Sequence, residues 1–231
     1  MRIFLTGDTH GSIDMGKLSS YKFPGGRLLT KNDLVIILGD FGVLWNNVPD
    51  KEEKYWINWL NNKPWTTLVV DGNHDNHTRF NALEEINMFN GKVGKISDSI
   101  FHLKRGQIYD INGIKTFTMG GATSIDKNRR VEGISWWKEE IPSYAEFDFA
   151  LENLEMHNNK VDLILTHTCP DRIVRELWNV YKLNCPVGIF LDEIQERVEF
   201  KKWYCGHMHV NRDFGMISIL YDKIVEIPLA F

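Results

Sequence analysis

Five short apolar runs recur along this chain, and each of them ends in a cluster of polar residues. The runs cover residues 2–6, 34–38, 66–70, 161–166 and 202–205. Because most of them are rich in Val, Ile and Leu and only four to six residues long, they predict buried strands. Segments with helical spacing lie between them, over residues 50–62, 144–158 and 187–197, and Asp50 is the expected N-cap of the first. This alternation predicts parallel strand pairing, at least in the N-terminal half.

The stretch from residue 92 to 119 has a different pattern, made of short β-like pieces. Asn112-Gly113 separates two of them and predicts a hairpin. A second hairpin is expected near residue 222, with residues 214–221 and 223–227 as its arms. The fold class predicted from these patterns is α/β, with two sheets and helices outside them. No repeat or flexible linker divides the sequence, so residues 1–231 are expected to form one domain.

Composition excludes several classes of protein. The net charge of −4 is not the basic footprint of a tight, nonspecific nucleic-acid binder. The three cysteines are odd in number and form no CxxC pair, which favours a reducing compartment. No apolar stretch is long enough for a signal peptide or a membrane span, so we expect a cytoplasmic protein without a membrane partner.

The polar clusters carry residues that can bind metal ions. In open α/β sheets, bound molecules lie beyond the carboxyl ends of the strands, where all five clusters are expected. A single His or Gly-Asp after a strand is more often a hydrogen-bonding or turn residue, but the joint occurrence of five clusters favours a metal site. The mixed oxygen and nitrogen set suits divalent ions, manganese first, with iron, zinc, nickel or magnesium as alternatives. The candidate ligands are Asp8, His10, Asp40, Asn73, His167, His207 and His209.

The order of these clusters resembles that of the calcineurin-like metallophosphoesterase superfamily, in particular its small bacterial and phage-type members. The superfamily pattern is DxH, GD, GNH[DE], a lone His and GHxH. This chain reads Asp8-Thr9-His10, Gly39-Asp40, Gly72-Asn73-His74-Asp75, His167 and Gly206-His207-Met208-His209. The resemblance implies a four-layer α/β/β/α sandwich, made of two mixed sheets flanked by helices, and a pair of divalent metal ions.

The resemblance also implies a role for each ligand. One metal ion would be held by Asp8, His10 and His209. The other would be held by Asn73, His167 and His207. Asp40 would bridge the two ions, which can share a hydroxide that attacks the phosphorus atom.

Two further residues of these motifs are expected to act without binding metal. His74 would stabilise the phosphoryl group and protonate the leaving oxygen, so His74 and Asp40 are the predicted catalytic residues. Asp75, like Thr166, is expected to orient nearby ligands, with an N-cap of a helix over residues 77–85 as an equal alternative for Asp75.

Departures from better-known branches of the superfamily narrow the activity. Protein phosphatases extend the second motif to GDxxDRG, and this chain has neither that second Asp nor that Arg after Asp40. Purple acid phosphatases have a Tyr three residues after the bridging Asp, where this chain has Val43. Neither activity is therefore expected.

The segment over residues 120–137 is the candidate for substrate recognition. It begins with two glycines, carries three cations and ends in two tryptophans. One interpretation is that Arg129 or Arg130 contacts a substrate phosphate while Trp136 or Trp137 stacks on a base. The alternative is a solvated loop followed by two core tryptophans.

The expected function is hydrolysis of a phosphodiester or phosphomonoester, with a small phosphate ester or a nucleotide as substrate. Two alternatives remain open. The first is a nuclease that acts on nucleic-acid ends or single strands, which the acidic net charge does not favour. The second is a non-catalytic, metal-bound scaffold, which would be expected to have lost His74.

Overall fold

A computed structural model describes residues 1–181 and 184–228, and these residues form two mixed β-sheets. The larger sheet has seven strands in the order β13-β1-β2-β3-β6-β5-β4. Strands β1, β2, β3 and β6 run parallel, while β13, β5 and β4 pair in the antiparallel sense. In chain order the strands are β1 (Ile3–Thr6), β2 (Leu34–Leu38), β3 (Thr66–Val70), β4 (Glu84–Met88), β5 (Gly91–Ser97), β6 (Ile100–Leu103) and β13 (Ile224–Ile227).

The smaller sheet has six strands in the order β11-β12-β10-β9-β8-β7. Its centre is parallel, because β12, β10, β9 and β8 all run in one direction, and each edge strand is antiparallel. The strands are β7 (Ile108–Ile111), β8 (Ile114–Met119), β9 (Leu163–Thr166), β10 (Lys202–Cys205), β11 (Arg212–Phe214) and β12 (Ile217–Ile219).

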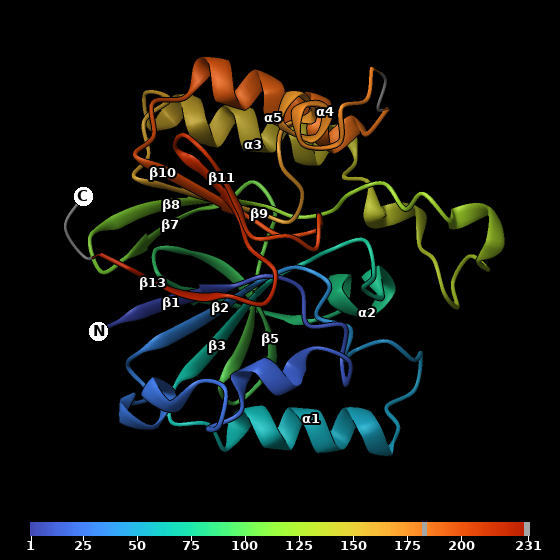
Figure 1. Cartoon of the computed structure of the whole chain (residues 1–231), viewed down its shortest axis with the longest axis vertical. Coiled ribbons are helices and arrows are strands. Elements are labelled where there is room, and N and C mark those ends of the chain that lie inside the picture. The colour runs from blue at the N-terminus through green and yellow to red at the C-terminus, as the bar shows by residue number, and fades with distance from the viewer. Residues whose placement is uncertain (182–183, 229–231) are drawn as a thin grey trace.

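Helices cover the outer faces of both sheets. Figure 1 shows α3, α4 and α5 on the side of the smaller sheet and α1 on the opposite side of the molecule, next to the larger sheet. The helices are α1 (Lys51–Asn61), α2 (His77–Asn81), α3 (Tyr144–Met156), α4 (Asp171–Trp178) and α5 (Pro186–Arg197). Short 3-10 helices are η1 (Met15–Leu18), η2 (Pro24–Leu28), η3 (Lys127–Arg129) and η4 (Lys138–Glu140).

Three hydrophobic cores hold these layers together. Ile36 of β2 and Leu165 of β9 belong to the core between the two sheets. Ile37, the next residue along β2, belongs to the core that includes Leu60 of α1, because successive side chains of a strand point to opposite faces. Ile164 of β9 likewise belongs to the core under the helices of the smaller sheet. The predicted four-layer α/β/β/α sandwich is therefore confirmed.

Local signals in the sequence account for the element boundaries. The Asp50 side chain accepts a 2.8 Å hydrogen bond from the backbone N–H of Glu53 and caps α1, as predicted. Ser143 and Glu146 form a capping box at the start of α3. The predicted hairpin at Asn112-Gly113 joins β7 to β8, and both turn residues have positive φ angles, 57° and 82°.

Two predictions about local structure were wrong. The expected hairpin around residue 222 does not form, since β12 pairs with β10 and β11 while β13 crosses to pair with β1 in the other sheet. The helix expected over residues 77–85 ends at Asn81, and β4 begins at Glu84.

Within the described part of the chain, no helix combines the length and the apolar character needed to cross a membrane.

Candidate metal centre

The candidate ligands all follow the carboxyl ends of parallel strands, and the two sheets bring these ends together. The larger sheet supplies Asp8 and His10 after β1, Asp40 after β2 and Asn73 after β3. The smaller sheet supplies the remaining three imidazoles, after β9 and β10. The centre therefore lies at one shared edge of both sheets.

The ligand atoms form two overlapping groups. Asp8, His10, Asp40 and His209 offer atoms that lie within 4.8 Å of one another, and so do Asp40, His167 and His207. Asp40 belongs to both groups. Its Oδ2 is 3.3 Å from His10 Nε2, and its Oδ1 is 3.3 Å from His167 Nε2.

Asn73 joins the second group through its amide oxygen. Asn73 Oδ1 lies 3.0 Å from His167 Nε2. The other ring nitrogen of His167 is 2.8 Å from the carbonyl oxygen of Leu38, a contact that fixes the ring and directs Nε2 toward the centre.

Two buried oxygen atoms test whether these residues suit metal ions. Within the described residues, Asp8 Oδ2 and Asp40 Oδ2 are buried and accept no hydrogen bond of suitable geometry, although His209 Nε2 lies 3.0 Å from the first and His10 Nε2 lies 3.3 Å from the second. A buried carboxylate oxygen that lacks a donor is unfavourable unless a cation balances its charge. The two oxygen atoms and the surrounding imidazoles thus form a donor set that fits divalent metal ions.

Interactions within the centre favour the charged forms of Asp40 and His10. Burial alone would raise the pKa of Asp40, but His167 and His10 outweigh burial and hold that pKa well below its usual range. Burial would lower the pKa of His10, yet the nearby carboxylates of Asp40, Asp8 and Asp14 raise it to about 9. The same field attracts divalent cations.

The backbone at the centre has an unusual conformation. His10, Asp40, His207 and His209 have φ angles of 43°, 45°, 64° and 51°, in the left-handed region. Such residues outside glycine are uncommon and cluster at functional sites. Gly39, the residue before Asp40, has a φ angle of 100°, which also favours glycine. A Cβ atom on Gly39 would in addition lie 1.9 Å from His167 Nδ1, so no larger residue fits there.

A first supporting group, not anticipated from the sequence, holds His10 and His209. Asp14 Oδ2 lies 3.0 Å from His10 Nδ1, and Asp14 Oδ1 accepts a 3.2 Å hydrogen bond from the Tyr221 hydroxyl. The Tyr221 ring stacks on His209 with ring centroids 4.8 Å apart. The buried Lys17 ammonium belongs to the same group and donates to the carbonyl oxygens of Gly7, Asp8 and Tyr221. In the sequence, this supporting role of Asp14 was indicated only by its position four residues after His10.

A second supporting group holds Asn73. Its amide nitrogen donates a 3.0 Å hydrogen bond to Ser124 Oγ, which in turn donates to a carboxylate oxygen of Glu140 at 2.5 Å. Both Ser124 and Glu140 are buried. This chain of contacts leaves Asn73 Oδ1 facing His167. Ser124 belongs to the segment from which the sequence suggested substrate contacts, and its supporting role could not be seen there.

Asp75 lies between the two loops that carry the candidate ligands Asp40 and Asn73. Its carboxylate accepts hydrogen bonds from the backbone N–H groups of Phe41, Gly42 and Gly72, so it ties together the loops after β2 and β3. Burial raises the pKa of Asp75 to about 7, and Asp40 adds to this effect. The N-cap of α2 is Asn76, so the capping alternative for Asp75 was wrong.

Thr166 and His74 complete the predicted set near the centre. The Thr166 hydroxyl donates to the carbonyl oxygen of Thr168 and accepts from the Trp203 indole, and neither contact is with a ligand ring. His74 is half-buried, and its backbone N–H donates to Asp40 Oδ1 at 2.7 Å. Its ring centroid is 5.9 Å from that of His10.

The four predicted substrate contacts lie in a segment that extends away from the sandwich (Figure 1, lime green). The Arg130 guanidinium is bound to the Asp126 carboxylate and to the Ser135 carbonyl. Arg129 is exposed and Trp136 is half-buried. Trp137 is only 2% exposed and packs edge-on against Trp45, so its ring is not open to a substrate in this arrangement. Substrate contact by these residues stays a prediction.

A buried cluster of charged and titratable side chains connects the ends of β3 and β6 with α2. Asp71 precedes the glycine of the third motif and lies 2.9 Å from His102 Nε2 and 2.6 Å from the Arg105 guanidinium. Arg105 also contacts His77 Nδ1 at 3.3 Å. Burial would raise the pKa of Asp71, but Arg105 and His102 hold it well below the usual range.

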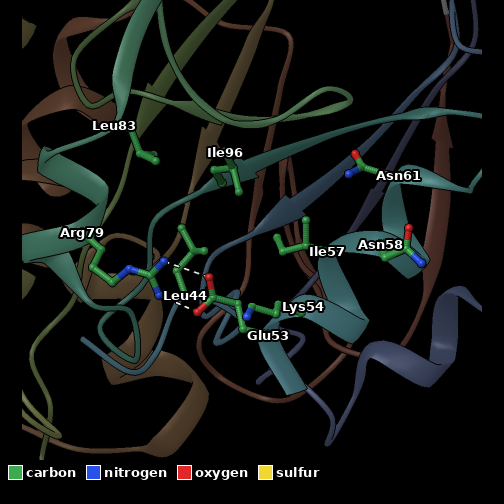
Figure 2. Close-up of a pocket in the computed structure, with 9 residues that line it drawn as sticks. All are labelled: Leu44, Glu53, Lys54, Ile57, Asn58, Asn61, Arg79, Leu83 and Ile96. Atoms are coloured by element: carbon green, nitrogen blue, oxygen red, sulfur yellow. Dashed lines mark hydrogen bonds and ion pairs between the residues drawn. The ribbon is translucent and has the colours of Figure 1, made fainter. Parts of the chain in front are cut away.

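Two cavities differ in their relation to the centre. A cavity of about 870 Å³ is lined by Asp40, Asn73, His74 and His207 and continues toward α4 and α5. A smaller one of about 300 Å³, drawn in Figure 2, lies beside α1 and contains none of the candidate ligands. Figure 2 shows the Arg79 guanidinium bound to both carboxylate oxygens of Glu53, so these charges neutralise each other.

The chain matches a known protein family over most of its length. Residues 1–211 match the family described as calcineurin-like phosphoesterase, which confirms the resemblance seen in the sequence motifs. Comparison with individual curated proteins gives no match. The matched range includes all the candidate ligands, together with His74.

Proposed function

The chain belongs to the calcineurin-like phosphoesterase family, and we propose that it hydrolyses a phosphodiester or phosphomonoester with two divalent metal ions. The observation that carries this proposal is the convergence of carboxylates, an amide and imidazoles from five strand ends. Their spacing supports two adjacent cation sites, which would share the carboxylate of Asp40.

In this proposal each side chain has a definite task. Asp8, His10 and His209 would hold one ion, and Asn73, His167 and His207 the other, with Asp40 between them. When bound, the two ions would act as Lewis acids on the phosphate and lower the pKa of the attacking water. Manganese is the first choice among the metals that such a donor set accepts.

His74 is the proposed proton donor. It lines the large cavity beside the ligands, where a phosphate held at the centre would lie next to its ring. There the imidazole would donate a hydrogen bond to the phosphoryl group and a proton to the leaving oxygen. Its contact with Asp40 is made by the backbone, so the ring remains available for the substrate.

The test uses the purified protein with Mn²⁺ and two substrates, p-nitrophenyl phosphate and bis-p-nitrophenyl phosphate. At least one should be hydrolysed, and the rate should fall with EDTA. His74→Ala should lower kcat by roughly 100-fold or more for phenyl phosphate, whose leaving oxygen requires a proton, and by less for the p-nitrophenyl esters, because p-nitrophenolate leaves without one. His157→Ala, at the end of α3, is the matched control and should retain full activity.

The outcome that contradicts the proposal is equally clear. If calorimetry shows that Mn²⁺ binds but neither ester is hydrolysed faster than by Asp40→Asn, the protein is a metal-bound scaffold and not a hydrolase.

A further inference from the structure

The large cavity extends well beyond the space that a phosphate needs. At about 870 Å³ it is within the range of roughly 300–1,000 Å³ that small-molecule sites occupy. Its lining includes Asp40 and His74 of the candidate centre as well as Asp171 and Trp178 of α4. A phosphate at the centre would therefore leave the α4 end for the organic part of an ester.

Apolar side chains that are open to solvent gather on the walls of this cavity. Ile125 is 96% exposed and Trp178 is 52% exposed, and half-buried Met208 lies between two candidate ligands in sequence. Exposed apolar groups beside a candidate active centre provide a surface for an apolar, planar group. Trp178 offers such a group a partner for stacking.

The cavity wall also carries polar groups that lack partners. Among the described residues, Asp171 Oδ1 and Thr123 Oγ1 are buried without a hydrogen bond, and both residues line the cavity. Asp171 is 1% exposed, and Arg175 contacts only its other oxygen, Oδ2. A carboxylate oxygen accepts hydrogen bonds, so a matching ligand must bring an N–H or O–H group. An alkyl or lipid chain would leave this oxygen unsatisfied, which is unfavourable.

We propose that this cavity binds the nucleoside part of a mononucleotide-sized phosphoester, with its base near Trp178 and one of its N–H or O–H groups donating to Asp171. The proposal rests on the proposed function, because the phosphate would occupy the centre. A nucleoside has the required planar apolar face, several donors and a size that the cavity accommodates. The proposal assigns recognition of the nucleoside to α4, and not to Arg129 and Arg130 of the segment over residues 120–137.

The kinetic test compares two esters with the same leaving group, thymidine 5′-(p-nitrophenyl) phosphate and methyl p-nitrophenyl phosphate. The nucleoside ester should have the higher kcat/KM. Asp171→Asn and Trp178→Ala should each lower that kcat/KM roughly tenfold, as expected for one hydrogen bond or one stacked base, and change the methyl ester less than twofold. Asp192→Asn and Tyr144→Ala are the matched controls, an arginine-bound carboxylate on α5 and an exposed aromatic ring on α3.

A binding measurement separates this proposal from the proposed function. Thymidine, adenosine and guanosine, which carry no phosphate, are titrated into metal-free protein, and binding is followed by calorimetry. At least one should bind the wild type and bind Trp178→Ala more weakly. Equal kcat/KM for the two esters, or no nucleoside binding, would overturn the nucleoside cavity even if p-nitrophenyl phosphate is hydrolysed. Nucleoside binding without any hydrolysis would support the cavity and contradict the proposed function. A preference for oligonucleotide ends over mononucleotide esters would overturn the stated substrate size.

Discussion

Asn73 offers an amide oxygen to the centre, and the direction of that amide depends on one hydroxyl group. Its nitrogen is held by Ser124, which Glu140 holds in turn. Without the hydroxyl, the amide could turn and present nitrogen in place of oxygen. We therefore expect Ser124→Ala to weaken Mn²⁺ binding about 10- to 100-fold, the usual effect of losing a partner that orients a ligand. Calorimetric titration with Mn²⁺ measures this directly.

The matched control for that substitution is Ser99→Ala. Ser99 is also buried, and it is hydrogen bonded to Asn61. It directly precedes β6 and lies next to the start of β3, where Thr67 pairs with Ile100, whereas Asn73 follows the end of β3. Equal Mn²⁺ affinity in the two variants would show that Ser124 does not orient Asn73.

Single residues also show what the sequence could and could not predict about the site. The candidate ligands follow apolar runs in a recognisable order, so Asp40 and His167 could be named without a structure. Tyr221 could not, because it reaches the centre from a strand connection more than 200 residues along the chain from His10 and carries no motif. Such contacts depend on tertiary packing, which local patterns do not encode.

Whole elements were predictable where short-range chemistry decides them. The N-cap Asp50 and the hairpin at Asn112-Gly113 are examples, because a cap and a turn involve residues close in the chain. The partner of β13 was not predictable from the same information. Its alternating pattern fits a strand in either sheet, and only packing decides that it pairs with β1.

The cluster that joins β3, β6 and α2 should make folding sensitive to acid. Burial and Arg105 lower the pKa of His77 from 6.5 to about 3. Between these values the unfolded chain binds a proton that the folded chain does not, so the free energy of unfolding falls as pH falls. A single group contributes at most about 1.4 kcal/mol per pH unit to this slope. We expect metal-free His77→Gln to show a shallower loss of stability than the wild type between pH 6 and pH 4 (roughly the window that these two pKa values define).

Denaturant titrations at several pH values in that window provide the measurement. His157→Gln, which changes a half-buried histidine at the end of α3, serves as the control and should keep the wild-type slope. Parallel pH profiles for His77→Gln and the wild type would rule out His77 as a source of acid sensitivity.

In the molecule as a whole, the candidate metal centre lies where the two sheets meet. Asp40 and Asn73 belong to the larger sheet, whereas His167 and His207 belong to the smaller one. Each ion bound between them should favour the folded state by about 2.7 kcal/mol when free metal is 100 times the dissociation constant of its site. For a chain of this size, that energy corresponds to a rise in Tm of roughly 5–10 °C.

Thermal unfolding followed by circular dichroism, with Mn²⁺ and with EDTA, tests this expectation. Because removal of a ligand also changes the metal-free stability, the quantity to compare is the rise in Tm caused by Mn²⁺. It should be present in the wild type and lost in Asp40→Ala. A rise of the same size in both proteins would place the stabilising ions elsewhere.

The order of the ligands along the chain has a consequence for synthesis. Asp8 precedes all the other candidate ligands in the chain, whereas His207 and His209 are translated only after β10 of the smaller sheet. Neither of the two proposed cation sites is complete before that point. A prematurely terminated product would therefore have the buried carboxylates of Asp8 and Asp40 without the imidazoles opposite them, and it would be inert toward phosphoesters, not a hydrolase with altered selectivity.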